Sequence, residues 1–231
     1  MKRNVLPGLA LQAFALVLLL AYYLASGARP AFDTVAGWKV RYGWGYSAAA
    51  TAIFGGLIPY LYLLASGRIA QARRRAEFWF YLLFWGYRGL EVDLLYRLQA
   101  FLFGDKLQLA VIAPKVLVDQ LIYNPFIAAP VQVVFFLWKE RGFSFRATRP
   151  DLNFGYLATA VAAVLFSSWM VWLPAVSIIY SLPLALQIPL FNLVLCFWVL
   201  LLTFVAQRSA AQQTSSNGWH MKEDITAPRS E

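Results

Sequence analysis

Hydrophobic residues occupy six long stretches of the chain, and short polar segments separate them. A membrane hydrocarbon core of about 30 Å needs about 20 mostly apolar residues in a helix. The pattern therefore predicts an all-α fold, a polytopic transmembrane helix bundle of about six spans. The predicted spans are Val5–Leu24, Tyr46–Ser66, Glu77–Phe103, Leu107–Leu137, Phe154–Leu173 and Leu184–Ala206.

The first stretch follows two cations, so it is either a retained span or a secretory signal. A signal has an apolar region of about 7–15 residues. Val5–Leu24 is longer, and we predict a retained span. The chain then divides into an N-terminal span and loop (1–44), a membrane helix bundle (45–208) and a polar disordered tail (209–231), because Ser, Thr and Gln replace apolar residues after Gln207.

Small residues and prolines modify two of the predicted spans. Ala48, Ala52 and Gly56 recur at every fourth position of the second span, a spacing that lets another helix backbone approach closely. Ordinary use of alanine is the alternative explanation. The fourth span is too long for one straight crossing, and we expect it to kink or break near Asn124–Pro130, because proline lacks the N–H donor and clashes with the preceding turn.

Lysine and arginine are distributed unequally between the loops. With six spans and both termini on one side, thirteen cations fall on that side and four on the other. Cations favour the cytoplasmic side of membrane proteins. We therefore expect both termini on the cytoplasmic or equivalent side. The four cations of the opposite side are Arg29, Lys39, Arg41 and Lys106.

The composition supports the membrane class and excludes several others. Hydrophobic residues make up 61% of the 231-residue chain and charged residues only 13%, against about 45–50% and 25% in soluble domains. The net charge of +9 lies in short runs between apolar stretches, so we predict no nucleic-acid partner. The lone Cys196 excludes a disulfide scaffold and a cysteine-based zinc site. The sequence has none of the common catalytic or cofactor motifs, and we expect no enzyme activity, cofactor or metal.

Six ionisable residues lie within the third and fourth spans, and their formal charges cancel. A charge at the bilayer centre costs at least about 2.5–3.5 kcal/mol, so these groups must meet each other or water. Residues three or four apart face each other on a helix. The spacing therefore predicts three ion pairs, and a fourth i,i+4 pair extends the polar face with amides. The four pairs are Arg88–Glu91, Asp93–Arg97, Lys115–Asp119 and Gln120–Asn124.

The polar residues permit two functional interpretations. In the first, they line a pore or channel for small solutes along the third and fourth spans, because ionisable groups in membranes commonly mark solute pathways. In the second, they form a structural network in a membrane scaffold or assembly factor that transports nothing. Glu91 and Asp93 point about 160° apart, so they are not a carboxylate pair sharing one proton. The lipid bilayer is the predicted partner in both cases, and a homo-oligomer is compatible with either.

Two blocks of the sequence resemble a known family. The segment Ala113–Pro125 carries Lys115, Asp119-Gln120 and Pro125. This is similar to the central-helix motif of the Mpv-seventeen family, which includes a peroxisomal membrane protein. The segment Trp169–Pro183 is similar to the tryptophan–proline signature of that family, with Leu173 inserted before the proline. The resemblance covers about residues 46–208. It implies a small helical integral membrane protein of an organellar membrane, and some family members look like non-selective channels for small solutes. A bacterial-type inner membrane is the alternative location, because no Arg- and Ser-rich transit segment precedes the first span.

Overall fold

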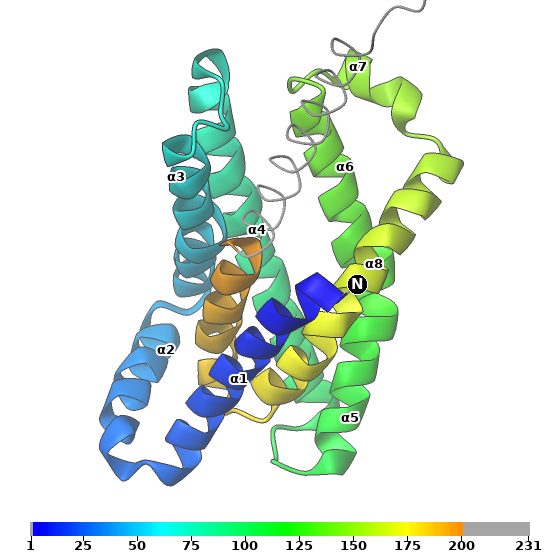
Figure 1. Ribbon diagram of the computed structural model, residues 1–231. Helices are drawn as coiled ribbons and strands as arrows, with labels where there is room; N and C mark the ends of the chain where they lie inside the picture. The colour runs from blue at the N-terminus through cyan, green and yellow to red at the C-terminus, as the bar shows by residue number, and fades with distance from the viewer. Residues whose placement is uncertain (1, 201–231) are drawn as a thin grey trace, which may run out of the picture.

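The computed structural model describes residues 2–200, and every regular element among them is helical (Figure 1). The all-α class is therefore confirmed for this part of the chain. The predicted polar tail and the last residues of the sixth predicted span lie outside it. The helices are α1 (Lys2–Leu24), η1 (Ser26–Ala28), α2 (Arg29–Thr51), η2 (Ala52–Leu57), α3 (Ile58–Ala65), η3 (Gln71–Arg73), α4 (Arg74–Phe103), α5 (Leu109–Val118), η4 (Asp119–Ala128), α6 (Ala129–Glu140), α7 (Phe145–Thr148), η5 (Arg149–Asp151), α8 (Phe154–Tyr180) and Leu184–Leu200.

The lengths and apolar composition of the helices support a membrane protein, but they do not establish six spans. Ser26–Ala65 and Leu109–Glu140 are long and apolar enough to cross a membrane. The two halves of α8, bent by 53° against each other, would make a third span. Helix α4 has the length but carries four charged residues between Arg88 and Arg97, and Leu9–Leu24 and Leu184–Leu200 are apolar but shorter. The six-span bundle therefore remains a prediction.

The segment after α1 is a helix, where the sequence analysis expected a loop. Helix α2 begins with Pro30 in its first turn, a position where proline costs no hydrogen bond. Its helical geometry breaks at Gly43, with φ of 52° and ψ of −122°, a conformation that residues with a Cβ rarely adopt. The helix resumes immediately and continues through η2 and α3 to Ala65. Residues 29–42 thus form a short helical segment before the break, and its Lys39 side chain reaches Asp93 of α4.

Small residues bring the second predicted span against α4 at short range. A Cβ added to Gly89 of α4 would lie 2.3 Å from the carbonyl oxygen of Ser47, and one added to Gly56 would lie 2.6 Å from the carbonyl oxygen of Tyr81. Real Cβ atoms do not occur at such distances from backbone, so these glycines set the helix separation. The predicted close approach at Ala48, Ala52 and Gly56 is confirmed.

The predicted kink in the fourth span is replaced by a change of helix type. Leu109–Glu140 runs as one helix through Pro114, Pro125 and Pro130. From Asp119 to Ala128 the backbone widens into a π-helix, which accommodates Pro125 without a break. Long π-helical stretches are rare, and short ones occur frequently at functional sites. The irregular segment thus begins at Asp119, ahead of the expected position.

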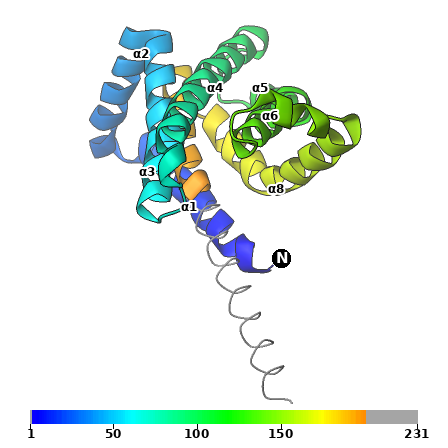
Figure 2. The same cartoon turned by 90° about the horizontal axis from the view of Figure 1, so that it is seen from above.

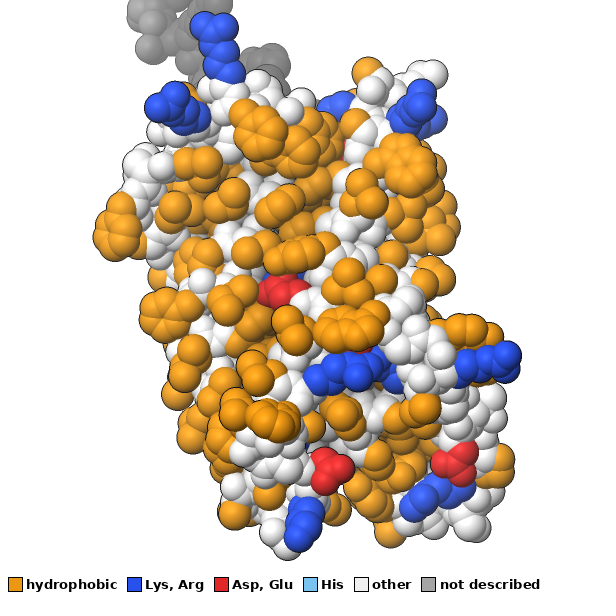
Figure 3. All heavy atoms as spheres, turned by 180° about the vertical axis from the view of Figure 1, so that it is seen from behind, with side chains coloured by type: hydrophobic (Ala, Val, Ile, Leu, Met, Phe, Trp, Pro, Cys, Tyr) orange, Lys and Arg blue, Asp and Glu red, His pale blue; other side chains and the backbone are white. Residues whose placement is uncertain are grey.

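Seen from above, α4 runs between two groups of helices, with α2 and α3 on one side and α5, α6 and α8 on the other (Figure 2). Large apolar side chains cover much of the outer surface between the two ends of the molecule (Figure 3). Phe101, Leu109, Phe126 and Phe154 are each at least three-quarters exposed. Such a surface is unfavourable in water and suits contact with lipid chains.

One end of the molecule is strongly cationic. The α3–α4 loop and the segment after α6 lie together at this end (top of Figure 1), and the Arg73 guanidinium donates a hydrogen bond to the Lys139 carbonyl oxygen across them. The α1–α2 and α4–α5 connections lie at the opposite end (Figure 1). The cations of the first end are Arg68, Arg73, Arg74, Arg75, Lys139, Arg141, Arg146 and Arg149.

This arrangement predicts the accessibility of single cysteines. In a Cys196→Ala background, Gln71→Cys and Arg146→Cys should react with a membrane-impermeant thiol reagent from the cytoplasmic side, because cations favour that side. Asp105→Cys should react only from the other side. Labelling of intact spheroplasts and of inverted vesicles checks this. Reaction of Gln71→Cys and Asp105→Cys from the same side would show that the two ends do not lie across a membrane.

Candidate functional site

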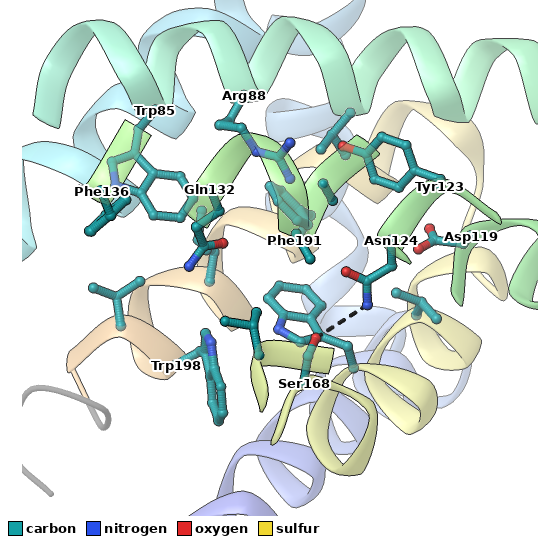
Figure 4. Close-up of a pocket in the computed structure, with 18 of the residues that line it drawn as sticks. Trp85, Arg88, Asp119, Tyr123, Asn124, Gln132, Phe136, Ser168, Phe191 and Trp198 are labelled. Atoms are coloured by element: carbon teal, nitrogen blue, oxygen red, sulfur yellow. Dashed lines mark hydrogen bonds between the residues drawn. The ribbon is translucent and has the colours of Figure 1, made fainter. Parts of the chain in front are cut away.

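A cavity of about 600 Å³ lies inside the bundle, between α4, the η4–α6 helix, α8 and Leu184–Leu200 (Figure 4). Its lining begins near Arg68 at the cationic end and continues to Asp119 in the middle of the molecule. Most of the wall is apolar, and the volume is within the range of about 300–1,000 Å³ that is usual for ligand sites. The polar residues that line it deep in the bundle are Arg88, Asp119, Gln120, Asn124, Gln132 and Ser168.

One wall carries a line of amide side chains. Gln120, Asn124, Ala128 and Gln132 follow at every fourth position of the η4–α6 helix, and all four line the cavity. Asn124 Nδ2 lies 3.4 Å from Gln120 Oε1 and 3.3 Å from Ser168 Oγ on α8. The Gln120–Asn124 contact predicted from the spacing is therefore present. Gln132 was not among the predicted site residues, although it continues the same spacing and could have been found from it.

Arg88 extends from α4 into the cavity, as Figure 4 shows. Its Nη1 atom donates to both carboxylate oxygens of Glu91, each at 2.9 Å, which confirms the predicted i,i+3 pair. The Arg88 side chain is 9% exposed, and its Cζ atom lies 5.8 Å from the centre of the Tyr123 ring. No residue that the structure describes accepts a hydrogen bond from Nε or Nη2. A buried guanidinium thus presents unused N–H groups beside the cavity.

Asp119 lies at the opposite end of the cavity from Phe136 and Trp198 (Figure 4). Its Oδ2 atom accepts a hydrogen bond from the Tyr180 hydroxyl at 2.7 Å, and its Oδ1 atom accepts one from Gln120 Nε2 at 2.8 Å. Gln99 Nε2 in turn donates to the Tyr180 oxygen at 2.8 Å. Two neutral donors therefore hold this buried carboxylate directly, and Gln99 of α4 holds one of them, the Tyr180 hydroxyl.

The predicted ion pair between Lys115 and Asp119 is wrong for this structure. In the described part of the chain no carboxylate oxygen lies within 4 Å of Lys115 Nζ. Lys115 is 1% exposed, and its ammonium lies 5.7 Å from the centre of the Tyr180 ring. The i,i+4 spacing permits the pair, but Tyr180 and Gln120 donate the hydrogen bonds that the carboxylate accepts. The Tyr180 ring provides Lys115 with a cation–π contact instead.

The Asp93 cluster, which we define as Asp93, Lys39, Ser47 and Arg97, lies outside the cavity lining, between α2 and α4. Asp93 Oδ2 accepts from Lys39 Nζ at 2.7 Å and from Ser47 Oγ at 2.9 Å. Arg97 Nε donates to Oδ1 at 3.1 Å, so the predicted Asp93–Arg97 pair is confirmed. Asp93 is 1% exposed and Lys39 4%.

The structure thus divides the predicted polar network into two groups. Arg88, Asp119, Gln120 and Asn124 line the cavity, with Glu91 holding Arg88. Asp93 and Arg97 belong to the Asp93 cluster, and Lys115 faces Tyr180. Sequence reasoning missed the members of these networks that come from other segments or lie at other spacings, namely Lys39, Ser47, Gln99, Ser168 and Tyr180.

In residues 2–200 no three His, Cys, Asp or Glu side chains lie close enough together to hold a metal ion. Comparison of the chain with family models, with curated proteins and with solved structures found no match in any of the three.

Proposed function

We propose that this protein is a pore or channel-like membrane protein that admits small polar solutes through the cavity beside α4. The observation that carries the proposal is a cavity of about 600 Å³ inside an apolar helix bundle, with polar side chains converging on it from α4, η4–α6 and α8. Such groups are costly in a membrane interior, which makes them functional candidates. The resemblance of Ala113–Pro125 to the Mpv-seventeen motif points in the same direction, because Asp119 and Gln120 of this motif line the cavity from the π-helix.

The proposed path begins at the cationic end, near Arg68, and continues past Gln132 and Asn124 to Asp119. Polar side chains along one wall would replace part of the water that a solute loses on entry. The lining stops at Asp119 and Tyr96, both of which are buried. We place the entrance at the cationic end because Arg68 is exposed, so passage of a solute requires movement at the Asp119 end.

Two substitutions in the amide line test the proposal. Asn124→Leu and Gln132→Leu should each reduce solute flux in proteoliposomes several-fold, because they remove polar groups from the path. The melting temperature should stay nearly unchanged, because the hydrogen bonds of Asn124 are long and Gln132 makes none with the described residues. Gln71→Leu, the same change at an exposed position of the cationic end, should leave flux unchanged and is the matched control.

A structural scaffold is the second candidate function, and the Asp93 cluster favours it. Both oxygens of this carboxylate are held by partners from two helices, outside any solute path. In a scaffold, the polar side chains that line the cavity would likewise only hold helices together. Absence of flux with the unmodified protein, or unchanged flux in both leucine variants, would favour the scaffold over the pore.

A further inference from the structure

We infer that the cavity takes a net-neutral molecule that carries a carboxylate and an ammonium together at one end and a planar apolar ring at the other, the chemistry of a zwitterionic aromatic amino acid. The inference rests on the proposed function in one respect, that the cavity is a solute site. It adds the class of solute, which follows from the charge balance, the two charged residues of the binding surface and the aromatic walls.

The charges around the deep part of the cavity cancel, whereas Arg68 at the cationic end is exposed, so a neutral occupant fits the deep part best. The Arg88 guanidinium is balanced by Glu91, with which it shares two contacts at 2.9 Å. The Asp119 carboxylate and the Lys115 ammonium lie on either side of Tyr180, one at its hydroxyl and the other at its ring. A solute with net charge would have no counter-charge in this low-dielectric interior, where uncompensated charge is expensive.

Arg88 and Asp119 are the charged residues that line the deep part of the cavity, and they have opposite signs. Arg88 uses only Nη1 for Glu91, so its other N–H groups are available to a carboxylate. Each oxygen of Asp119 accepts one hydrogen bond from the protein and retains acceptor capacity for an ammonium. A dipolar solute can therefore satisfy both residues at once, which a simple acid or amine cannot.

Aromatic rings provide the remaining surface. An aromatic side chain can stack on another planar ring or contact it edge to face. Such a ring pair gains binding free energy beyond that of the area it buries. Tyr123 lies beside Asp119 (Figure 4), where its ring would also favour an ammonium group. The aromatic lining includes Trp85, Tyr123, Phe136, Trp172, Phe191 and Trp198.

The test compares three small probes on the unmodified, full-length protein in lipid nanodiscs by titration calorimetry. The probes are L-phenylalanine, phenethylamine, which lacks the carboxylate, and hydrocinnamate, which lacks the ammonium. We expect saturable binding of phenylalanine, with each truncated probe roughly tenfold weaker or more, as for loss of a charge-assisted hydrogen bond. Equal or tighter binding of either truncated probe, or no binding of phenylalanine, would overturn the inference.

Two charge-neutralising variants assign the two charged groups. Arg88→Gln should abolish the preference for phenylalanine over phenethylamine and keep the preference over hydrocinnamate. Asp119→Asn should do the reverse. Arg97→Gln on the same helix and Asp151→Asn on the surface are the matched controls, because neither residue lines the cavity. If a cavity variant and its control lost selectivity to the same extent, the assignment of the two charged groups would be wrong. If a variant does not fold, the probe series on the unmodified protein still decides the inference.

Flux measurements separate this inference from the proposed function. Selective binding of phenylalanine without flux of any solute would refute the pore and leave the solute class in place. Flux of small solutes without selective binding of phenylalanine would refute the solute class and leave the pore in place.

Discussion

Replacing Asp93 with leucine is expected to lower the free energy of unfolding by about 3–5 kcal/mol, the cost of leaving a buried charge without its partner. Lys39 Nζ lies 2.7 Å from Asp93 Oδ2, and the two side chains are 5% and 2% exposed. Without the carboxylate, the only remaining acceptor of Lys39 among the described residues is the Gly43 carbonyl oxygen at 3.2 Å. The substitution also removes the closer of the two acceptors of the Ser47 hydroxyl. Thermal and detergent-induced unfolding of the purified protein measures the loss.

A second substitution identifies the partner. Lys39→Met combined with Asp93→Leu should recover much of the lost stability, because the double variant buries neither charge. Arg97 needs no such change, since its side chain is 42% exposed and can reach solvent or headgroups. Asp151→Leu breaks the exposed Arg141–Asp151 pair and, as a control, should cost less than about 1 kcal/mol. A double variant no more stable than Asp93→Leu would mean that Lys39 is not the principal partner.

Gly89→Ala should cost about 3 kcal/mol, at the upper end of the usual range for overpacking. The added Cβ would lie 2.3 Å from the Ser47 carbonyl oxygen and 2.6 Å from Thr51 Oγ1. The first of these atoms is backbone, so the clash is relieved only if α2 moves away from α4. That movement would also loosen the Asp93 cluster and the hydrogen bond between Thr51 and Asn192.

Gly86→Ala is the matched control for this prediction. It lies on the same helix, and its added Cβ would be 3.7 Å from the Ala48 carbonyl oxygen and 3.8 Å from the Ala52 Cβ, ordinary contact distances. Alanine also favours a helix over glycine by about 1 kcal/mol, so stability should be unchanged or slightly higher. Melting temperatures of the two variants, measured side by side, decide the point, and equal losses would contradict the close packing of α2 against α4 at Gly89.

The class of the protein and its local polar pairs were predictable from the sequence. Apolar stretches of sufficient length predict helices whatever their neighbours, because every backbone group must be satisfied within the membrane. Arg88–Glu91, Asp93–Arg97 and Gln120–Asn124 are present because residues three or four apart on one helix are neighbours by geometry alone. The small residues at Ala48, Ala52 and Gly56 likewise indicated the side of the second span that faces another helix.

Only the tertiary structure decided which of these polar groups face the cavity and which serve packing. Lys39 and Asp93 are 54 residues apart, and Tyr180 and Asp119 are 61 apart, so no local spacing indicates either contact. The Lys115–Asp119 prediction failed for the same reason. Spacing shows which side chains of one helix can meet, but a donor from a distant helix, here Tyr180, can bind the carboxylate instead. The cavity itself depends on how α4, η4–α6, α8 and Leu184–Leu200 pack, and that packing follows from the fit of side chains between helices, which the order of residues along one helix does not specify.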